Sequence, residues 1–127
     1  MRMLDTDVLI DVGRGYPPAR QWLSSLTETP GVPNIVYMEL IGGCQNKAAL
    51  HQVQRLIASY LLFWLREPDC QLALALFLRF RLSHNLGLAD ALIAATAIGQ
   101  GATLCTFNIK HFASIPGLVT EQPYAKP

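Results

Sequence analysis

The sequence opens with MRMLDTDVLIDVGRG (residues 1–15), which has the pattern of a strand that runs directly into a helix. Residues 1–4 are mostly apolar and predict a short strand, and apolar residues then recur at helical spacing up to Gly13. Apolar strand segments and longer helical segments alternate along the rest of the chain, without an internal repeat. This alternation predicts an α/β fold with a mostly parallel sheet, whose ligand site lies beyond the carboxyl ends of the strands.

Other segments follow from the same periodicity. We expect further strands at residues 32–36, 60–65, 102–105 and 118–120, and helices at residues 19–26, 37–44, 47–59, 69–81 and 88–98. The helix at residues 69–81 is apolar on nearly all sides, so we expect it to be buried on more than one side, with part of it in a dimer interface.

Length and composition restrict the class of protein. The 127 residues predict a single domain spanning residues 1–127, and the hydrophobic content of 51% excludes a disordered chain. The longest apolar run, residues 72–78, is much shorter than the roughly 20 residues of a membrane-spanning helix, so no membrane association is expected. The net charge of +1 gives no global attraction for a polyanion, so any nucleic-acid contact must depend on a local basic patch.

The three cysteines, Cys44, Cys70 and Cys105, are odd in number, widely spaced and adjacent to apolar segments. Such cysteines are typical of buried, reduced thiols, which favours a cytoplasmic protein. Asp5 interrupts the first residues before an apolar stretch can form, so no secretory signal is expected. The histidines and cysteines lack the spacing of a zinc site.

Three carboxylates, Asp5, Glu39 and Asp90, lie in otherwise apolar segments with few basic residues nearby. Burying an unpaired carboxylate costs several kcal/mol, so such groups need a cation, strong hydrogen-bond donors or exposure in a cleft. Clustered carboxylates are ligands for Mg²⁺ or Mn²⁺, which also bind phosphate oxygens. The three acids therefore indicate metal-assisted hydrolysis of a phosphate ester or phosphodiester.

Each acid also has a purely structural explanation. Asp5 or Asp7 can cap the first helix, Glu39 can face solvent, and Asp90 can cap the alanine-rich helix. We interpret Asp7 mainly as a capping residue. We favour the metal site because all three acids occur together in this pattern.

Together these residues resemble the PIN-domain family, most closely the small VapC-type toxins of bacterial toxin–antitoxin pairs, over nearly the whole chain. LDTDVLID (residues 4–11) resembles the family's opening motif, and Glu39 lies at its second acidic position. LADALIAATA (residues 88–97) resembles the third acidic motif, and LCTFNIKHF (residues 104–112) resembles the closing motif, a strand followed by Thr-x-Asn.

The resemblance implies a PIN-like three-layer α/β/α sandwich with a mostly parallel central sheet of four or five strands. It implies an endoribonuclease that needs Mg²⁺ or Mn²⁺, held by Asp5, Glu39 and Asp90, with no protein nucleophile. It also implies a homodimer and a cognate antitoxin whose tail enters the acidic cleft, with the helix at residues 69–81 as a contact surface. Residues expected to orient the ligands or waters are Thr6, Asp7, Thr106 and Asn108.

The closing motif departs from many relatives because it lacks a fourth acid, with Asn108 and His111 at the candidate positions. Asn108 remains a candidate ligand, but it brings no charge, so we expect weaker binding of a second ion. His111 can replace the acid, contact phosphate or lie on the surface, and we favour the surface. Among the basic residues, we expect Arg14 and Lys110 to contact RNA.

Two other functions fit parts of the sequence. Asp5-Thr6-Asp7-Val8 (residues 5–8) also fits the opening motif of haloacid-dehalogenase-type phosphatases, with Asp5 as a covalent nucleophile, but their later motifs are missing. Alternatively, the fold serves as a weakly active or inactive binding module, because the fourth acid is missing.

Overall fold

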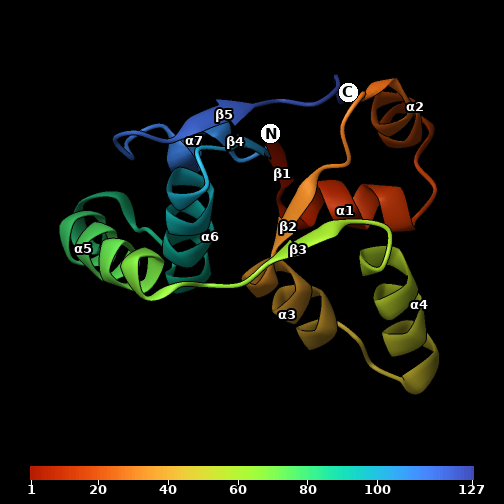
Figure 1. Cartoon of the computed structure of the whole chain (residues 1–127), viewed down its shortest axis with the longest axis horizontal. Coiled ribbons are helices and arrows are strands. Elements are labelled where there is room, and N and C mark those ends of the chain that lie inside the picture. Colours follow the sequence, from red (N-terminus) through yellow and green to blue (C-terminus); the bar gives the residue numbers. More distant parts are fainter.

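The computed structural model describes residues 1–127 and contains five strands and seven helices (Figure 1). The strands are β1 (Arg2–Leu4), β2 (Gly31–Pro33), β3 (Leu61–Phe63), β4 (Thr103–Cys105) and β5 (Val119–Glu121). The helices are α1 (Thr6–Gly13), α2 (Pro17–Ser25), α3 (Asn34–Gly42), α4 (Lys47–Ile57), α5 (Glu67–His84), α6 (Leu88–Gly99) and α7 (Ile109–Phe112). None of these helices combines the length and apolar character that crossing a membrane requires.

All five strands form one parallel sheet in the order β3-β2-β1-β4-β5. Parallel neighbours need crossover connections, and here helices supply them (Figure 1). In Figure 1, α5 lies at the left and α6 lies below β4 and β5, whereas α1, α2 and α4 lie to the right of β1. The predicted three-layer α/β/α sandwich is confirmed, and its sheet is entirely parallel.

The strand order reverses between β1 and β4. From β1 the chain adds β2 and then β3 on one side, and it then returns to add β4 and β5 on the other side. Ligands of open α/β sheets bind at such a switch point, outside the carboxyl ends of the two strands. Here those ends are followed by Asp5 and Thr106, which are both buried.

The hydrophobic core joins the sheet to its helices: α6 packs against β2 and β4, and Val8 and Leu9 of α1 belong to the same buried cluster. Met3, Leu4 and Leu104 are fully buried in the two central strands. The alanines on the buried face of α6 have no exposed surface, and their small size allows close approach of the helix to the sheet. This packing fixes the position of the first turn of α6, which carries Asp90.

A strand boundary, a short helix and one cysteine differ from the sequence-based expectation. The strand expected at residues 32–36 ends at Pro33, and α3 begins at Asn34, because proline has no N–H to continue the parallel ladder. The short helix α7 was not expected at all. Cys70 is exposed rather than buried, whereas Cys105 is buried and Cys44 is intermediate, and all three are free thiols.

Within one chain, helix α5 is buried on one side only, and burial of its other side in a dimer interface stays a prediction. Its inner side packs on α6 through residues such as Leu76 and Phe80. Its outer side carries leucines at every fourth position with exposed fractions of 60%, 76% and 97%, and we call these the leucine stripe: Leu74, Leu78 and Leu82.

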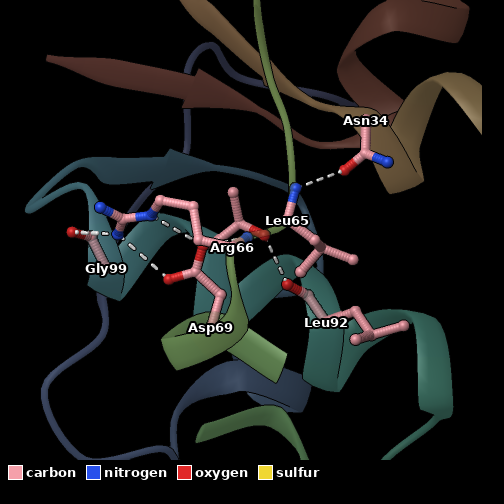
Figure 2. A network of polar contacts seen from close by, with 7 residues as sticks. Asn34, Leu65, Arg66, Asp69, Leu92 and Gly99 are labelled. Carbon is pink, nitrogen blue, oxygen red and sulfur yellow. Dashed lines mark hydrogen bonds and ion pairs between the residues drawn. The ribbon is translucent and has the colours of Figure 1, made fainter. Parts of the chain in front are cut away.

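An ion pair at the start of α5 is linked to the end of α6 by a hydrogen bond from Arg66 (Figure 2). Asp69, 1% exposed, accepts hydrogen bonds from the backbone and side chain of Arg66, whose Nη2 also donates to the carbonyl oxygen of Gly99 at 2.9 Å. A Cβ at Gly99 would collide with the Asp69 carboxylate. Glycine is therefore required where the two helices meet, and Asp69 lies in the first turn of α5 rather than before it.

Candidate functional site

Asp5 lies at the switch point and is held from both sides. It immediately follows β1 and caps α1, since its Oδ1 accepts a hydrogen bond from the Thr6 N–H at 2.7 Å. Its Oδ2 accepts a hydrogen bond from the hydroxyl of Thr106, which follows β4, also at 2.7 Å. Two segments about 100 residues apart in the sequence thus fix one carboxylate.

The Asp5 carboxylate, 3% exposed, has no basic partner. Burial raises its pKa from 3.8 to about 7, and the negative charges of Asp7 and Asp90 add to this rise. The hydrogen bonds from Thr106 and Thr6 favour the ionised form but do not restore the usual pKa. A positive charge placed next to Asp5 would therefore be strongly stabilised.

Glu39 and Asp90 approach the same site from different helices. The Glu39 Oε1, on the exposed side of α3, accepts a hydrogen bond from the Thr6 hydroxyl at 2.7 Å. Burial raises the pKa of Asp90, the positive charge of His111 opposes that rise, and the charges of Glu39 and Asp7 add to it. Four carboxylates therefore influence one another electrostatically: Asp5, Asp7, Glu39 and Asp90.

His111 lies beside Asp90, with its Nε2 at 3.8 Å from the Asp90 Oδ2. Its side chain is about half exposed, so the expectation of a surface position is correct as far as exposure is concerned. The expectation missed its neighbour, because no periodicity in the sequence predicts the short helix α7 that carries it.

Asp7 joins α1 to the turn after β4. Its Oδ1 accepts a hydrogen bond from the Val8 N–H at 2.8 Å, and its Oδ2 accepts one from the Phe107 N–H at 2.9 Å. Asp5 is the residue that caps α1, so the interpretation of Asp7 mainly as a capping residue is incomplete. Asp7 instead ties the loop that contains Thr106 to the first turn of α1.

The three acids singled out in the sequence converge on one end of the sheet but do not form a finished metal shell. No three of the His, Cys, Asp and Glu side chains lie close enough together to hold an ion as they stand. Their chemistry nevertheless fits a hard dication, because Asp5, Glu39 and Asp90 supply oxygen ligands and form no ion pair with lysine or arginine. Asn108 is exposed next to them, and its backbone N–H donates to the Thr106 hydroxyl at 3.0 Å.

The two basic residues expected to contact RNA lie at different places. Lys110 is exposed on α7, next to His111. Arg14 follows the far end of α1, about 13 Å along the helix axis from Asp5 at 1.5 Å per residue. The structure thus places Lys110, but not Arg14, near the carboxylates.

A large cavity lies away from the carboxylates. It has a volume of about 810 Å³ and lies between α1, α2, α3 and α4, and we call it the α1–α4 groove. Apolar side chains such as Leu9, Leu23 and Leu56 line it, together with Arg14, Arg20 and Arg55, and it contains no acidic residue. Nothing in the sequence had indicated this groove.

Comparison with known proteins agrees with this geometry. A family model described as "PIN domain" matches residues 2–118. The chain belongs to the PIN-domain family. It is 40% identical to Ribonuclease VapC10 of Mycobacterium tuberculosis, covering 100% of this chain and 96% of the relative. It is 31% identical to Ribonuclease VapC19 of the same species, covering 98% of this chain and 100% of the relative.

Solved structures of PIN-domain relatives have the same fold. A toxin–antitoxin complex from Klebsiella pneumoniae matches with a TM-score of 0.77 and 30% identity, over 99% of this chain and 100% of the other. VapBC2 from Rickettsia felis, bound to a DNA fragment from its promoter, matches with a TM-score of 0.82 and 25% identity. The match covers 94% of this chain and 96% of the other. The resemblance inferred from the sequence is confirmed, and this PIN domain is similar to VapC proteins along nearly its whole length.

Proposed function

We propose that this protein is an endoribonuclease dependent on Mg²⁺ or Mn²⁺ and the toxin of a toxin–antitoxin pair. The observation that carries the proposal is Asp5, a buried carboxylate without a basic partner that faces the charges of other carboxylates. The relatives named as ribonucleases, at 40% and 31% identity, support RNA as the substrate. We expect the protein to act in the cytoplasm, where its three free thiols stay reduced.

Asp5, Glu39 and Asp90 are the proposed metal ligands. A bound dication would supply an activated water and neutralise charge on the phosphate that is hydrolysed. Asp5 is already oriented by the Thr6 N–H and the Thr106 hydroxyl, and the Thr6 hydroxyl orients Glu39. No protein nucleophile is needed.

Asn108 stands where many relatives of this type carry a fourth acid. It offers a neutral carbonyl oxygen, so a second ion would bind more weakly than the first. Asp7 supports the site indirectly, through the Phe107 N–H. Lys110, exposed beside His111 on α7, is proposed to contact the RNA backbone close to the carboxylates. Arg14 is proposed to contact the RNA backbone farther from them.

The α1–α4 groove is the proposed binding surface for the antitoxin. Its apolar lining and its three arginines, without any acid, suit an amphipathic segment that carries acidic residues. The toxin–antitoxin complexes among the structural relatives support such a partner. This assignment replaces α5 as the expected antitoxin contact, because α5 offers a convex helix face rather than a groove.

The leucine stripe of α5 is the proposed contact with a second copy of the chain. Three exposed leucines in line would be covered by an antiparallel copy of the same helix. Such a pairing, centred on Leu78, would place Leu74 of each copy opposite Leu82 of the other, so the apolar side chains are self-complementary.

Cleavage of assorted RNAs in the presence of Mn²⁺ tests the ribonuclease proposal. The wild type should cleave, Asp90→Asn should lose at least about 100-fold in rate, and Glu28→Gln should behave as the wild type because Glu28 is exposed and outside the site. Equal background cleavage by the wild type and Asp90→Asn would favour the binding module instead. Trapping of a covalent phosphate on Asp5 would favour the phosphatase.

A further inference from the structure

The C-terminal segment after β5, residues 122–127, folds back across the molecule toward α2 (Figure 1). We call residues 122–127 the C-terminal tail. Its Tyr124 and Lys126 side chains reach α1 and the turn after β4. We infer that Tyr124 and Lys126 of this tail are positioning residues for the carboxylate site, an inference that rests on the metal site proposed above.

The tail is anchored on Asp11 of α1. The Tyr124 hydroxyl donates to the Asp11 Oδ2 at 2.6 Å, and the Lys126 Nζ lies at 2.6 Å from the same oxygen. The Asp11 side chain is only 14% exposed, so both contacts are shielded from water. Asp11 lies one helical turn after Asp7, so the anchor is on the same side of α1 as the site.

From this anchor the tail holds Phe107, the residue that follows Thr106. The rings of Tyr124 and Phe107 meet edge to face with centroids 4.8 Å apart, and the Lys126 Nζ lies 4.3 Å from the centroid of the Phe107 ring. Tyr124 also contacts Tyr16 and Trp22, so its own ring is fixed by two further aromatic side chains.

The backbone of this turn binds the carboxylates. The Phe107 N–H donates to Asp7 at 2.9 Å, the Asn108 N–H donates to the Thr106 hydroxyl at 3.0 Å, and that hydroxyl donates to Asp5 at 2.7 Å. The turn is fixed on the sheet side by the Thr106 N–H, which donates to the Glu121 carbonyl oxygen at 3.0 Å. On its outer side, the tail is what holds the Phe107 side chain.

The Lys126 Nζ is bound to Asp11, and its charge opposes the rise that burial causes in the pKa of Asp7, but it makes no ion pair with Asp5, Glu39 or Asp90. Lys126 therefore acts as part of the anchor and does not substitute for the dication. The tail thereby sets the position of the Asp7 and Asp5 carboxylates through the turn, without touching substrate.

The full-length double variant Tyr124→Ala/Lys126→Ala tests this role with two measurements. Amide hydrogen exchange measured by NMR should show protection at Phe107 and Asn108 falling about 10-fold or more, with α6 unchanged. The Kd for Mn²⁺ alone, measured by calorimetry, should rise about 10-fold, as expected when the groups that orient metal ligands are lost. Lys126→Met, a milder change, should move both quantities in the same direction by a smaller factor.

Two control variants separate positioning from general loosening of the C-terminal region. Lys126→Arg keeps the Tyr124 hydroxyl, the ring packing and the cation, and it should keep the Mn²⁺ affinity within about twofold. Arg2→Gln removes the other ion pair of this region, Arg2 with Glu121 at 2.7 Å, without touching Phe107, and it should also leave the affinity unchanged.

Retained protection at Phe107 in the double variant would overturn the inference, as would an unchanged Mn²⁺ affinity after that protection is lost. A wild type that binds no Mn²⁺ would refute the proposed function and the positioning role together. The exchange data would still show in that case whether the tail holds the turn, so the two failures are distinguishable.

Discussion

Replacing Asp5 by asparagine should stabilise the metal-free protein while it removes a proposed metal ligand. Asp5 is 3% exposed, and burial together with the charges of Asp7 and Asp90 raises its pKa from 3.8 to about 7. Above pH 7 the folded protein therefore carries an ionised carboxylate in surroundings less favourable than water. Asparagine keeps the size of the side chain and one acceptor oxygen but carries no charge.

The size of the effect follows from the pKa. A rise from 3.8 to about 7 is about three pKa units at about 1.4 kcal/mol each, which sets a ceiling of about 4 kcal/mol. About 1 kcal/mol of this is lost because the Thr106 hydroxyl, which now donates to Asp5, must turn to accept from the new amide. We expect a net gain of about 3 kcal/mol, or a rise in Tm of about 10 °C for a chain of this length.

The effect should depend on pH with a defined sign. The folded-state pKa of Asp5 is higher than the unfolded value. The loss of wild-type stability caused by the ionised Asp5 carboxylate is therefore absent below about pH 4, grows from pH 4 to 7 and is constant above pH 7. Thermal unfolding in EDTA should therefore give equal Tm values near pH 4 and a higher Tm for Asp5→Asn at pH 7.5. Added Mn²⁺ should raise the Tm of the wild type only. A variant that melts below the wild type at pH 7.5 in EDTA would refute the reasoning.

Three further predictions concern other parts of the molecule. Gly99→Ala places a methyl group against the buried Asp69 carboxylate and should lower the free energy of unfolding in urea by about 2–4 kcal/mol; a loss below about 0.5 kcal/mol would contradict this. Leu78→Glu introduces charge into the leucine stripe and should give a monomer by light scattering at concentrations where the wild type is a dimer. A thiol reagent should modify exposed Cys70 quickly and Cys105 hardly at all, since burial raises the pKa of the Cys105 thiol to about 12.

The fold was largely predictable because its signals are local. Short apolar runs separated by helical periodicity predict a parallel sheet, and each of the five strands overlaps its expected segment, although β2 and β3 end two or three residues early. The convergence of Asp5, Glu39 and Asp90 was also accessible, since each follows or faces the carboxyl end of a strand. Their mutual electrostatic influence agrees with the neighbourhood expected from the sequence.

Contacts between distant segments could not be predicted. The approach of His111 to Asp90 depends on α7, whose four residues are too few to give a periodic signal. The binding of Tyr124 and Lys126 to Asp11 joins positions more than 110 residues apart, and no local pattern marks such a pair. The sequence pattern of α5 does not say which of its apolar sides faces the core of the same chain, because leucines occur on both sides of the helix.

The hydrogen bond between the Thr106 hydroxyl and Asp5 joins positions 101 residues apart, so the proposed active site depends on both ends of the chain. During translation, Asp5 leaves the ribosome long before its hydroxyl donor has been made. A nascent chain of this design lacks the hydrogen bond that orients the Asp5 carboxylate until Thr106 has been synthesised.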